Sequence, residues 1–561
     1  MRHARVGRGY RMQKVDPQAG QSIASNIFFE AALREVPRLL GQIDRNPLSK
    51  TYGSCDRAFW LYRTNDISSM RYQEAALTLA LLYATPFEGN GYCGDDRLKS
   101  WANAVIRFAC MRQHRNGSFD EWYLHEGSFV CTAFVSAALS EAALVLGGAL
   151  EDTEQVMAML KASGRWLAHH TETLVVNQLA GAVCALHTIH KVTGDAACKE
   201  AAEEKYAVLL SLQHEEGWWS EYGGPDAGYV SLTIDHLSRY AERAHDAQAW
   251  SAIEKASAFL LHCLNPDGTA GGEYLSRNTE YLIPSGFFRS ATHCESARRI
   301  ASHVARMHAE DIGITPRSLD DRYICYILYN WIEAGIVQST LEHRPALPTV
   351  VLQKFSDTFF PDAGLFVGSG GAYQIFVNLK KGGSLRLYTR DSVLIDSGIN
   401  VCLSGHVYVG NVLDSNTEIS YDESTRTLRS AGALIRVQAP LLTTGRAIGL
   451  KSAQWVFGRI PALQKLLKRT LRMASVMRPG SPSPLRYERI ISLQADAVTI
   501  TDTLNAALPR DSLVVGEANT YALVPSSRYV ATGALLAYLR PQSEVYELTG
   551  GTTRLTRTFT V

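Results

Sequence analysis

The feature that most constrains the fold is a helical periodicity from about residue 25 to residue 345. Apolar residues recur there three and four positions apart, as in AALTLALLYA from Ala75 and FVCTAFVSAALSEAALVLG from Phe129, which is the spacing of one helix face. Short breaks with Gly, Asp, Asn or Pro separate the predicted helices.

Three of these breaks resemble one another: RNGSFDEWYLHEGSF, EEGWWSEYGGPDAGYVSL and PDGTAGGEYLSRNTEYLI. Their turn glycines are Gly117, Gly217 and Gly268, so the intervals are 100 and 51 residues and the period is near 50 with one unit skipped. Such a period predicts helical hairpins repeated around a ring or solenoid. We expect the loops of one rim to face the same way and to line a common cleft.

After residue 346 the pattern changes to short alternating segments, such as AYQIFVNL, SLRLYT and RIISLQADAVTITDTL. These predict strands and hairpins, and a β-sandwich is the default for so many of them. We therefore divide the chain into an N-terminal extension (1–24), a helical array (25–345) and a β-rich domain (346–561).

A basic insertion interrupts the β-rich domain near 445–490. It contains ten Lys or Arg residues and one acid, Glu488, and RIPALQKLLKRTLRMASVM within it has amphipathic helical spacing. One interpretation is contact with an anionic polymer or a membrane surface. The simpler alternative is a basic surface excursion packed on the sheets.

Composition excludes several classes of function. The 561 residues include 56 basic and 55 acidic ones, a net charge of +1, so no global field would recruit nucleic acid. No uninterrupted apolar stretch is long enough for a membrane span of roughly 18 to 20 residues. The sequence has no G-x-S-x-G elbow, no phosphate loop and no HExxH helix, so we predict no nucleotide, cofactor or metal.

The ten cysteines are scattered singly, without a CxxC pair, which suits buried thiols in a reducing compartment. We therefore expect a cytoplasmic protein, or a periplasmic or secreted one if a signal segment was removed. As to oligomeric state, the sequence leaves a homodimer open.

The loops combine aromatic side chains, which stack on sugar rings, with polar side chains that hold hydroxyls or a carboxylate. For each residue a structural alternative stands beside this: an N-cap for Asn177, core filling for the two tryptophans, a loop brace for Arg277, and a hydrogen-bond partner for His125. Asp235 and His236 lie within a helix and are expected to be structural. The candidate glycan-binding residues are Gln178, Trp218, Trp219, Glu221, Tyr274, Asn278, Tyr281, His125 and Glu126.

The order of NQLAG from Asn177, GWWSEYGGPDAGY, GGEYLSRNTEYL and KKGGSLRLYTRDSVLIDSG resembles the heparinase II/III-like polysaccharide lyases over most of the chain. The resemblance implies an incomplete (α/α) toroid of helical hairpins followed by an antiparallel β-sandwich, with an acidic polysaccharide or oligosaccharide bound between them. It also implies β-elimination of a uronic-acid-containing glycan, bacterial exopolysaccharides among them.

By the same resemblance, Asn177 meets the uronate carboxylate and Tyr229 handles protons. The family's β-domain commonly has a histidine-rich strand, and the matching GGSLRLYTRD has no histidine. His406, in SGHVYVG, is the only histidine after residue 344 and is taken as its substitute. A structural metal in the β-domain is therefore not supported by the sequence.

The chemistry has a rationale of its own. A proton alpha to a carboxylate leaves only if the developing enolate is neutralised, which Asn177 and Arg277 would do. A positive charge also lowers the pKa of a nearby tyrosine, so Tyr229 would take the C5 proton. The same phenol, a neighbouring one (Tyr222 or Tyr281) or a histidine would protonate the leaving oxygen.

Two alternatives remain. A glycoside hydrolase on the same scaffold would use a carboxylate pair. A non-catalytic glycan-binding or assembly protein would keep the fold without the chemistry. The acids available for a hydrolase are Glu126, Glu221, Asp226, Glu273 and Glu280.

Overall fold

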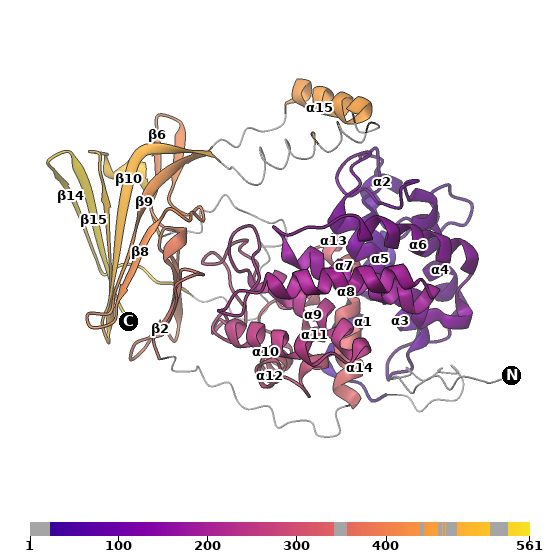
Figure 1. Ribbon diagram of the computed structural model, residues 1–561. Helices are drawn as coiled ribbons and strands as arrows, with labels where there is room; N and C mark the ends of the chain where they lie inside the picture. The colour runs from indigo at the N-terminus through magenta and orange to yellow at the C-terminus, as the bar shows by residue number, and fades with distance from the viewer. Residues whose placement is uncertain are drawn as a thin grey trace. The chain divides into compact units, whose positions relative to one another are not determined.

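The computed structural model describes residues 23–340, 356–437, 443–457, 460, 463, 466, 480–516 and 537–561 (Figure 1). The chain forms two compact units. The first comprises 1–213, 230–258 and 282–348, and the second comprises 214–229, 259–281 and 349–561. Two loop segments of the helical region therefore belong to the same unit as the sheets.

The helical region consists of paired helices. α3 packs against α4 and α5, α5 against α6 and α7, and α7 against α8; α11 packs against α12 and α14, and α14 against α1 and α3. Inner helices thus follow one another around a ring with outer partners beside them, which confirms the predicted (α/α) toroid. The helices are α1 (Ile27–Gln42), α2 (Arg57–Trp60), α3 (Ala75–Ala84), α4 (Asp96–Arg112), α5 (Phe129–Leu146), α6 (Thr153–Ala168), α7 (Val176–Thr193), α8 (Ala196–Ser211), α9 (Ala227–Ala244), α10 (Ala247–Leu261), α11 (Pro284–Ser290), α12 (Glu295–Ala309), α13 (Asp321–Ile327) and α14 (Tyr329–Thr340).

Inner helices α3 and α5 are apolar on all sides because they are covered on all sides. Every residue of α3 from Ala75 to Leu82 is buried. In the described residues one stretch, Phe129–Ala149, which contains α5, is long and apolar enough to cross a membrane, and 78% of its apolar window is buried inside the protein. Its place among the inner helices accounts for that composition.

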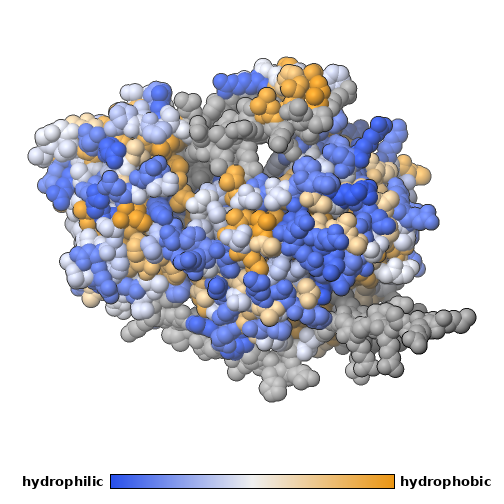
Figure 2. Space-filling view, viewed as in Figure 1, coloured by the Kyte–Doolittle hydropathy of each residue, from blue (hydrophilic) through white to orange (hydrophobic). Residues whose placement is uncertain are grey.

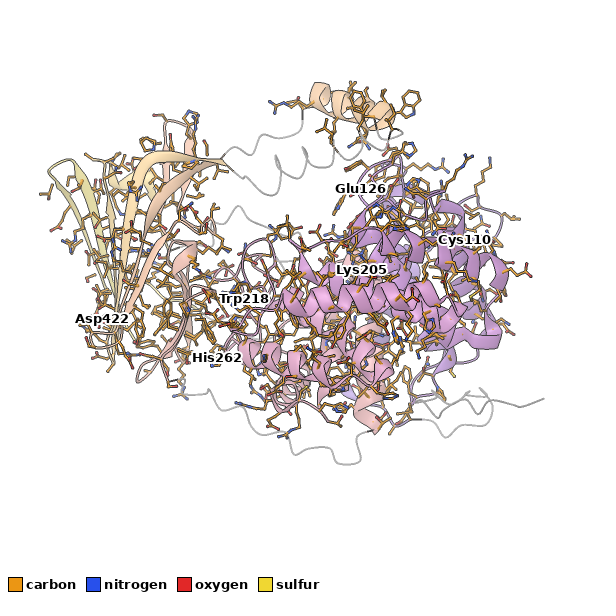
Figure 3. The ribbon with its side chains drawn as sticks, viewed as in Figure 1. Cys110, Glu126, Lys205, Trp218, His262 and Asp422 are labelled. Atoms are coloured by element: carbon orange, nitrogen blue, oxygen red, sulfur yellow. The ribbon has the colours of Figure 1, made fainter. Side chains whose placement is uncertain are left out.

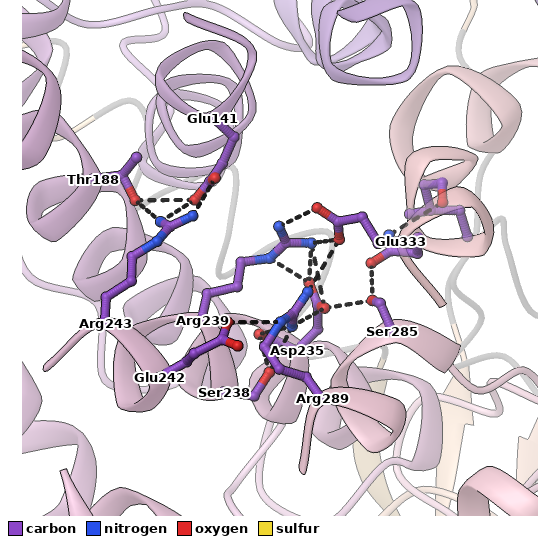
Figure 4. Close-up of polar contacts among 12 residues, drawn as sticks. Glu141, Thr188, Asp235, Ser238, Arg239, Glu242, Arg243, Ser285, Arg289 and Glu333 are labelled. Atoms are coloured by element: carbon purple, nitrogen blue, oxygen red, sulfur yellow. Dashed lines mark hydrogen bonds and ion pairs between the residues drawn. The ribbon is translucent and has the colours of Figure 1, made fainter. Parts of the chain in front are cut away.

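A buried ion-pair network joins three inner helices of the first unit (Figure 4). Arg239 on α9 donates to Glu333 on α14 at 2.7 Å and pairs with Asp235, one turn away, at 3.2 Å. Arg289 on α11 reaches the same two acids, at 3.3 Å to Asp235 and 3.2 Å to Glu333. Arg289 also lies 3.6 Å from the exposed Glu242. Asp235 is thus paired with two guanidinium groups and serves structure, as expected.

The β-rich region contains two sheets. Within the described residues the first has the strand order β1-β2-β3-β4-β5-β13, and the second has the order β12-β6-β7-β9-β10-β11-β15-β14, with β8 on β9. All pairs are antiparallel except β5 with the two-residue β13. The strands are β1 (Thr358–Phe360), β2 (Leu365–Ser369), β3 (Gln374–Asn378), β4 (Ser384–Tyr388), β5 (Ser392–Asp396), β6 (Asn400–Leu403), β7 (His406–Val409), β8 (Glu418–Asp422), β9 (Thr427–Val437), β10 (Gly480–Leu493), β11 (Ala497–Leu504), β12 (Leu513–Val514), β13 (Ala537–Tyr538), β14 (Ser543–Thr549) and β15 (Thr552–Thr560).

The two sheets share one hydrophobic core, which makes them a sandwich. Ile375 and Leu385 of the first sheet pack in the same cluster as Ile491 and Ile500 of the second. β11 alternates buried and half-buried residues, as a strand with one covered face does. In β3 and β4 every residue is buried, because segment 259–281 covers the other face of the first sheet.

The predicted basic insertion lies partly outside the described residues. Its described part includes helix α15 (Thr444–Phe457), whereas β10 already begins at Gly480. Arg489, counted with the insertion by sequence, is therefore a strand residue, and it is fully buried between Asp396 and Asp502. Residues 1–22 of the predicted extension also lie outside the described residues.

Candidate functional site

The three similar loops share one backbone turn. In each, the amide of the first turn residue donates to the carbonyl four residues on, and the turn glycine donates back to the first carbonyl. The glycines have φ of +92°, +100° and +82°, a region that favours glycine. These findings confirm the repeat at the level of hydrogen bonds: His114 to Ser118 (3.0 Å), His214 to Trp218 (2.8 Å) and Asn265 to Thr269 (2.9 Å), with Gly117, Gly217 and Gly268 donating back.

Asp226 joins the second and third loops. This fully buried carboxylate lies immediately before α9 and accepts the amides of Tyr229 (3.3 Å), Arg277 (3.1 Å) and Thr279 (3.2 Å), as well as the Thr279 hydroxyl. Burial raises its pKa, although these hydrogen bonds and the Arg277 charge act to lower it. Tyr229 and Arg277, 48 positions apart in the sequence, are thus held by one side chain.

Arg277 and Tyr222 form a second contact beside Asp226. The guanidinium carbon of Arg277 lies 4.3 Å from the Tyr222 ring centroid, a cation–π distance, and both side chains are half-buried. Tyr281 packs against the start of α9, since a Cβ at Gly228 would lie 2.9 Å from its ring. The guanidinium of Arg277 and the phenols of Tyr222 and Tyr281 therefore lie in or against these two loops.

Lys381, which no sequence pattern singled out, anchors the third loop. It is fully buried, and its Nζ donates to the Leu275 carbonyl and to Asn278 Oδ1, each at 2.5 Å. Burial lowers the pKa of Lys381 to about 7, with Glu273 and Asp226 acting to raise it and Arg277 to lower it further. Asn278, a predicted glycan ligand, is thus engaged inside the unit.

Arg386 on β4 was also missed, and it binds two of the acids considered for a hydrolase. It donates to Glu273 at 2.8 and 2.5 Å and also to Glu280. Gly272 permits this approach, because a Cβ there would lie 2.6 Å from the Arg386 guanidinium. Burial, opposed by Arg386, raises the pKa of Glu280 to about 7. Burial also acts to raise the pKa of Glu273, yet Arg386 brings it below its ordinary value.

Several predicted glycan-binding aromatics are packed inside the second unit. Trp219 and Tyr274 are fully buried, and the Tyr274 ring stacks on Phe376 at 5.1 Å. Trp218, labelled in Figure 3, is also buried, and its ring stacks on the His214 ring with 4.4 Å between the ring centroids. These rings offer no open face to a sugar, so the core-filling alternative describes them. Glu221 is likewise fully buried.

His125 and Glu126 stabilise their own loop in the first unit. The His125 amide donates to Asp120 at 2.8 Å. The Glu126 carboxylate, labelled in Figure 3, accepts the amides of Glu121 and Trp122 at 2.9 and 2.8 Å. Contact of either residue with a sugar stays a prediction.

Asn177 and Gln178 also belong to the first unit, in the first turn of α7, where Asn177 is buried and Gln178 half-buried. Their cooperation with Tyr229 and Arg277 stays a prediction. His406 is exposed on β7 in the second unit, and its ring nitrogens lie 3.0 and 3.1 Å from Arg436 Nη2. Among the described residues no group of three or more His, Cys, Asp or Glu is placed to hold a metal ion.

The first unit also contains a polar cluster that no sequence motif predicted. Arg71 lies between the rings of Phe134 (4.6 Å) and Tyr326 (4.4 Å) and pairs with Glu74, and His236 stacks on Phe134 at 5.1 Å. Burial raises the pKa of Glu74 to about 7 and lowers that of His236 to about 4.

This cluster faces α7 at Gly181, where a Cβ would collide with the Phe134 ring. Gly181 is one turn after Asn177, and residues four apart share a helix face. Asn177 therefore lies on the same face of α7 as this acid–base cluster.

No protein-family model matches this chain, and no curated protein matches its sequence. Solved structures match its fold. The chondroitin AC lyase of Streptomyces coelicolor A3, in complex with chondroitin sulphate, aligns with a TM-score of 0.55 at 11% identity, over 86% of this chain and 67% of that one. A Paenibacillus xanthan lyase aligns with a TM-score of 0.50 at 11% identity, over 85% of this chain and 45% of that one.

The fold is one that polysaccharide lyases share. A heparinase III also aligns at 11% identity, with a TM-score of 0.43. At such identities the likeness establishes architecture alone, and this chain spans less than half of the xanthan lyase.

Proposed function

We propose that this protein is a polysaccharide lyase that cleaves a uronic-acid-containing polysaccharide, or its oligosaccharides, by β-elimination. The observation that carries the proposal is the double anchoring of Tyr229 and Arg277 on Asp226. It holds the backbone amides of Tyr229 and Arg277 at one carboxylate, within a fold shared with lyases of chondroitin and xanthan.

In the proposed reaction Tyr229, as phenolate, takes the proton from C5 of the uronate. The electron pair of that C–H bond forms the C4–C5 double bond while the bond from C4 to the leaving oxygen breaks. Tyr222, in contact with Arg277, supplies the proton that the leaving oxygen needs. Arg277 and Asn177 stabilise the enolate that develops on the carboxylate.

The acids of the hydrolase alternative are less free than their sequence spacing indicates. Glu273 and Glu280 share Arg386, and Asp226 accepts three backbone amides. Each carboxylate therefore has a structural task, which favours elimination over a hydrolytic carboxylate pair.

The test is a screen of uronate-containing polysaccharides, bacterial exopolysaccharides included. The reaction is monitored by ultraviolet absorbance, because elimination leaves an unsaturated product. Tyr229→Phe should lower kcat by roughly 100-fold or more, and Arg277→Met by a similar factor. Tyr538→Phe removes an exposed phenol from the same unit and should leave turnover unchanged.

Other outcomes would refute the proposal. New reducing ends without ultraviolet absorbance would show hydrolysis. Binding of an acidic polysaccharide that survives prolonged incubation would show a non-catalytic protein. Full turnover by Tyr229→Phe would remove that phenol from the mechanism.

A further inference from the structure

Helix α15 and the residues just after it expose an unusual number of large apolar side chains. Ile448 is 63% exposed and Trp455 is 55% exposed, and Figure 2 shows hydrophobic residues gathered on this helix. Of the sixteen exposed large hydrophobic residues in the described parts of the chain, six lie between 448 and 466. Exposed apolar residues are ordinarily scattered singly on a soluble protein. The six are Ile448, Trp455, Val456, Phe457, Ile460 and Leu466.

The same stretch is strongly basic. Residues 445–479 contain eight Lys or Arg and no acid, whereas the whole chain has a net charge of +1, so all other residues together sum to −7. Arg446 and Lys451 are exposed on α15 itself. The positive charge is therefore concentrated in the stretch of sequence that also contains these six exposed apolar residues.

The sandwich does not need this stretch. Val437 at the end of β9 and Gly480 at the start of β10 are register partners, so the chain leaves the sheet and returns to it at adjacent points. A hairpin of two to five residues would make that connection. Residues 438–479 are thus an addition to the sheet.

We propose that α15 and its apolar neighbours dock on a lipid bilayer that carries anionic headgroups. Tryptophan favours the membrane interface, and a helix with basic and apolar side chains lies in the interface plane. The bilayer buries Ile448 and Trp455, which lie seven residues apart on one face of α15, while its headgroups meet Arg446 and Lys451. An acidic polysaccharide would explain the charge and leave the apolar side chains in water, so the bilayer accounts for more of the observations.

The experiment is co-sedimentation of the full chain with vesicles of phosphatidylcholine, with and without phosphatidylglycerol. Binding to the anionic vesicles should be at least about 10-fold tighter, and salt should weaken it because exposed charges are screened. The double variants Ile448→Ser/Trp455→Ser and Arg446→Gln/Lys451→Gln should each lose about 10-fold or more in affinity. Leu48→Ser, at a leucine that is 92% exposed in the first unit, is the matched control and should bind like the wild type.

Equal binding to both vesicle types, or none, would overturn the proposal. So would binding that survives the Ile448→Ser/Trp455→Ser change, and so would retention on an acidic polysaccharide without retention on vesicles. Thermal melting of each variant establishes that it is folded. Turnover of a soluble substrate should be the same in all of them, which separates this test from that of the lyase activity.

Discussion

Replacement of Lys381 by Met should remove a pH dependence of stability that the structure assigns to one buried amine. The pKa of Lys381 falls from 10.5 to about 7 on folding because the side chain is buried. Between these values the unfolded chain binds a proton that the folded chain does not, so the free energy of unfolding rises with pH. The slope is about 1.4 kcal/mol per pH unit, which amounts to roughly 2 kcal/mol between about pH 7 and about pH 8.5.

The measurement is urea denaturation of the wild type and Lys381→Met at both pH values. Loss of the hydrogen bonds to Leu275 and Asn278 lowers the variant's stability by a constant amount, whereas the titration enters only the wild type. The difference in unfolding free energy between the two proteins should therefore shift by roughly 2 kcal/mol in favour of the wild type at the higher pH. Lys380→Met, which removes the adjacent lysine, is the control. A difference that stays flat between the two pH values would mean that Lys381 keeps its ordinary proton affinity, and the reasoning would fail.

Two further predictions concern packing. Arg386→Met should lower the free energy of unfolding by about 3–5 kcal/mol, because it leaves buried carboxylates unpaired; adding Glu273→Gln should recover part of the loss in urea denaturation, and no recovery would count against charge as the cause. Gly181→Ala should cost about 1–3 kcal/mol by overpacking against Phe134, measured as a lower Tm. Gly41→Ala on α1, where a Cβ meets nothing within 4 Å, should not destabilise the protein, and equal Tm values for the two glycine variants would contradict the packing argument.

The sequence predicts what depends on local pattern. Three- and four-residue spacing located the helices, alternation located the strands, and the similar loops proved to contain the same hydrogen-bonded turn around Gly117, Gly217 and Gly268. The contents of the candidate site were partly predictable, since Tyr222, Tyr229 and Arg277 lie in those loops and share the surroundings of Asp226.

The rest depends on contacts between residues far apart in the sequence. Lys381 and Arg386 are ordinary basic residues of a turn and a strand until the chain places them against residues more than 100 positions earlier. Trp219 illustrates a second limit, because an aromatic side chain in a loop suits a sugar platform and a core equally well. Only its complete burial decides between them.

Membership of segments 214–229 and 259–281 in the sheet-bearing unit has a consequence for biogenesis. These segments precede β4 by more than a hundred residues, yet the Leu275 carbonyl and the Glu273 carboxylate accept hydrogen bonds from Lys381 and Arg386. During synthesis these two loops cannot complete their contacts until Lys381 and Arg386 have left the ribosome. Division of the chain near residue 345 would accordingly give two incomplete fragments, and neither could assemble these loops alone.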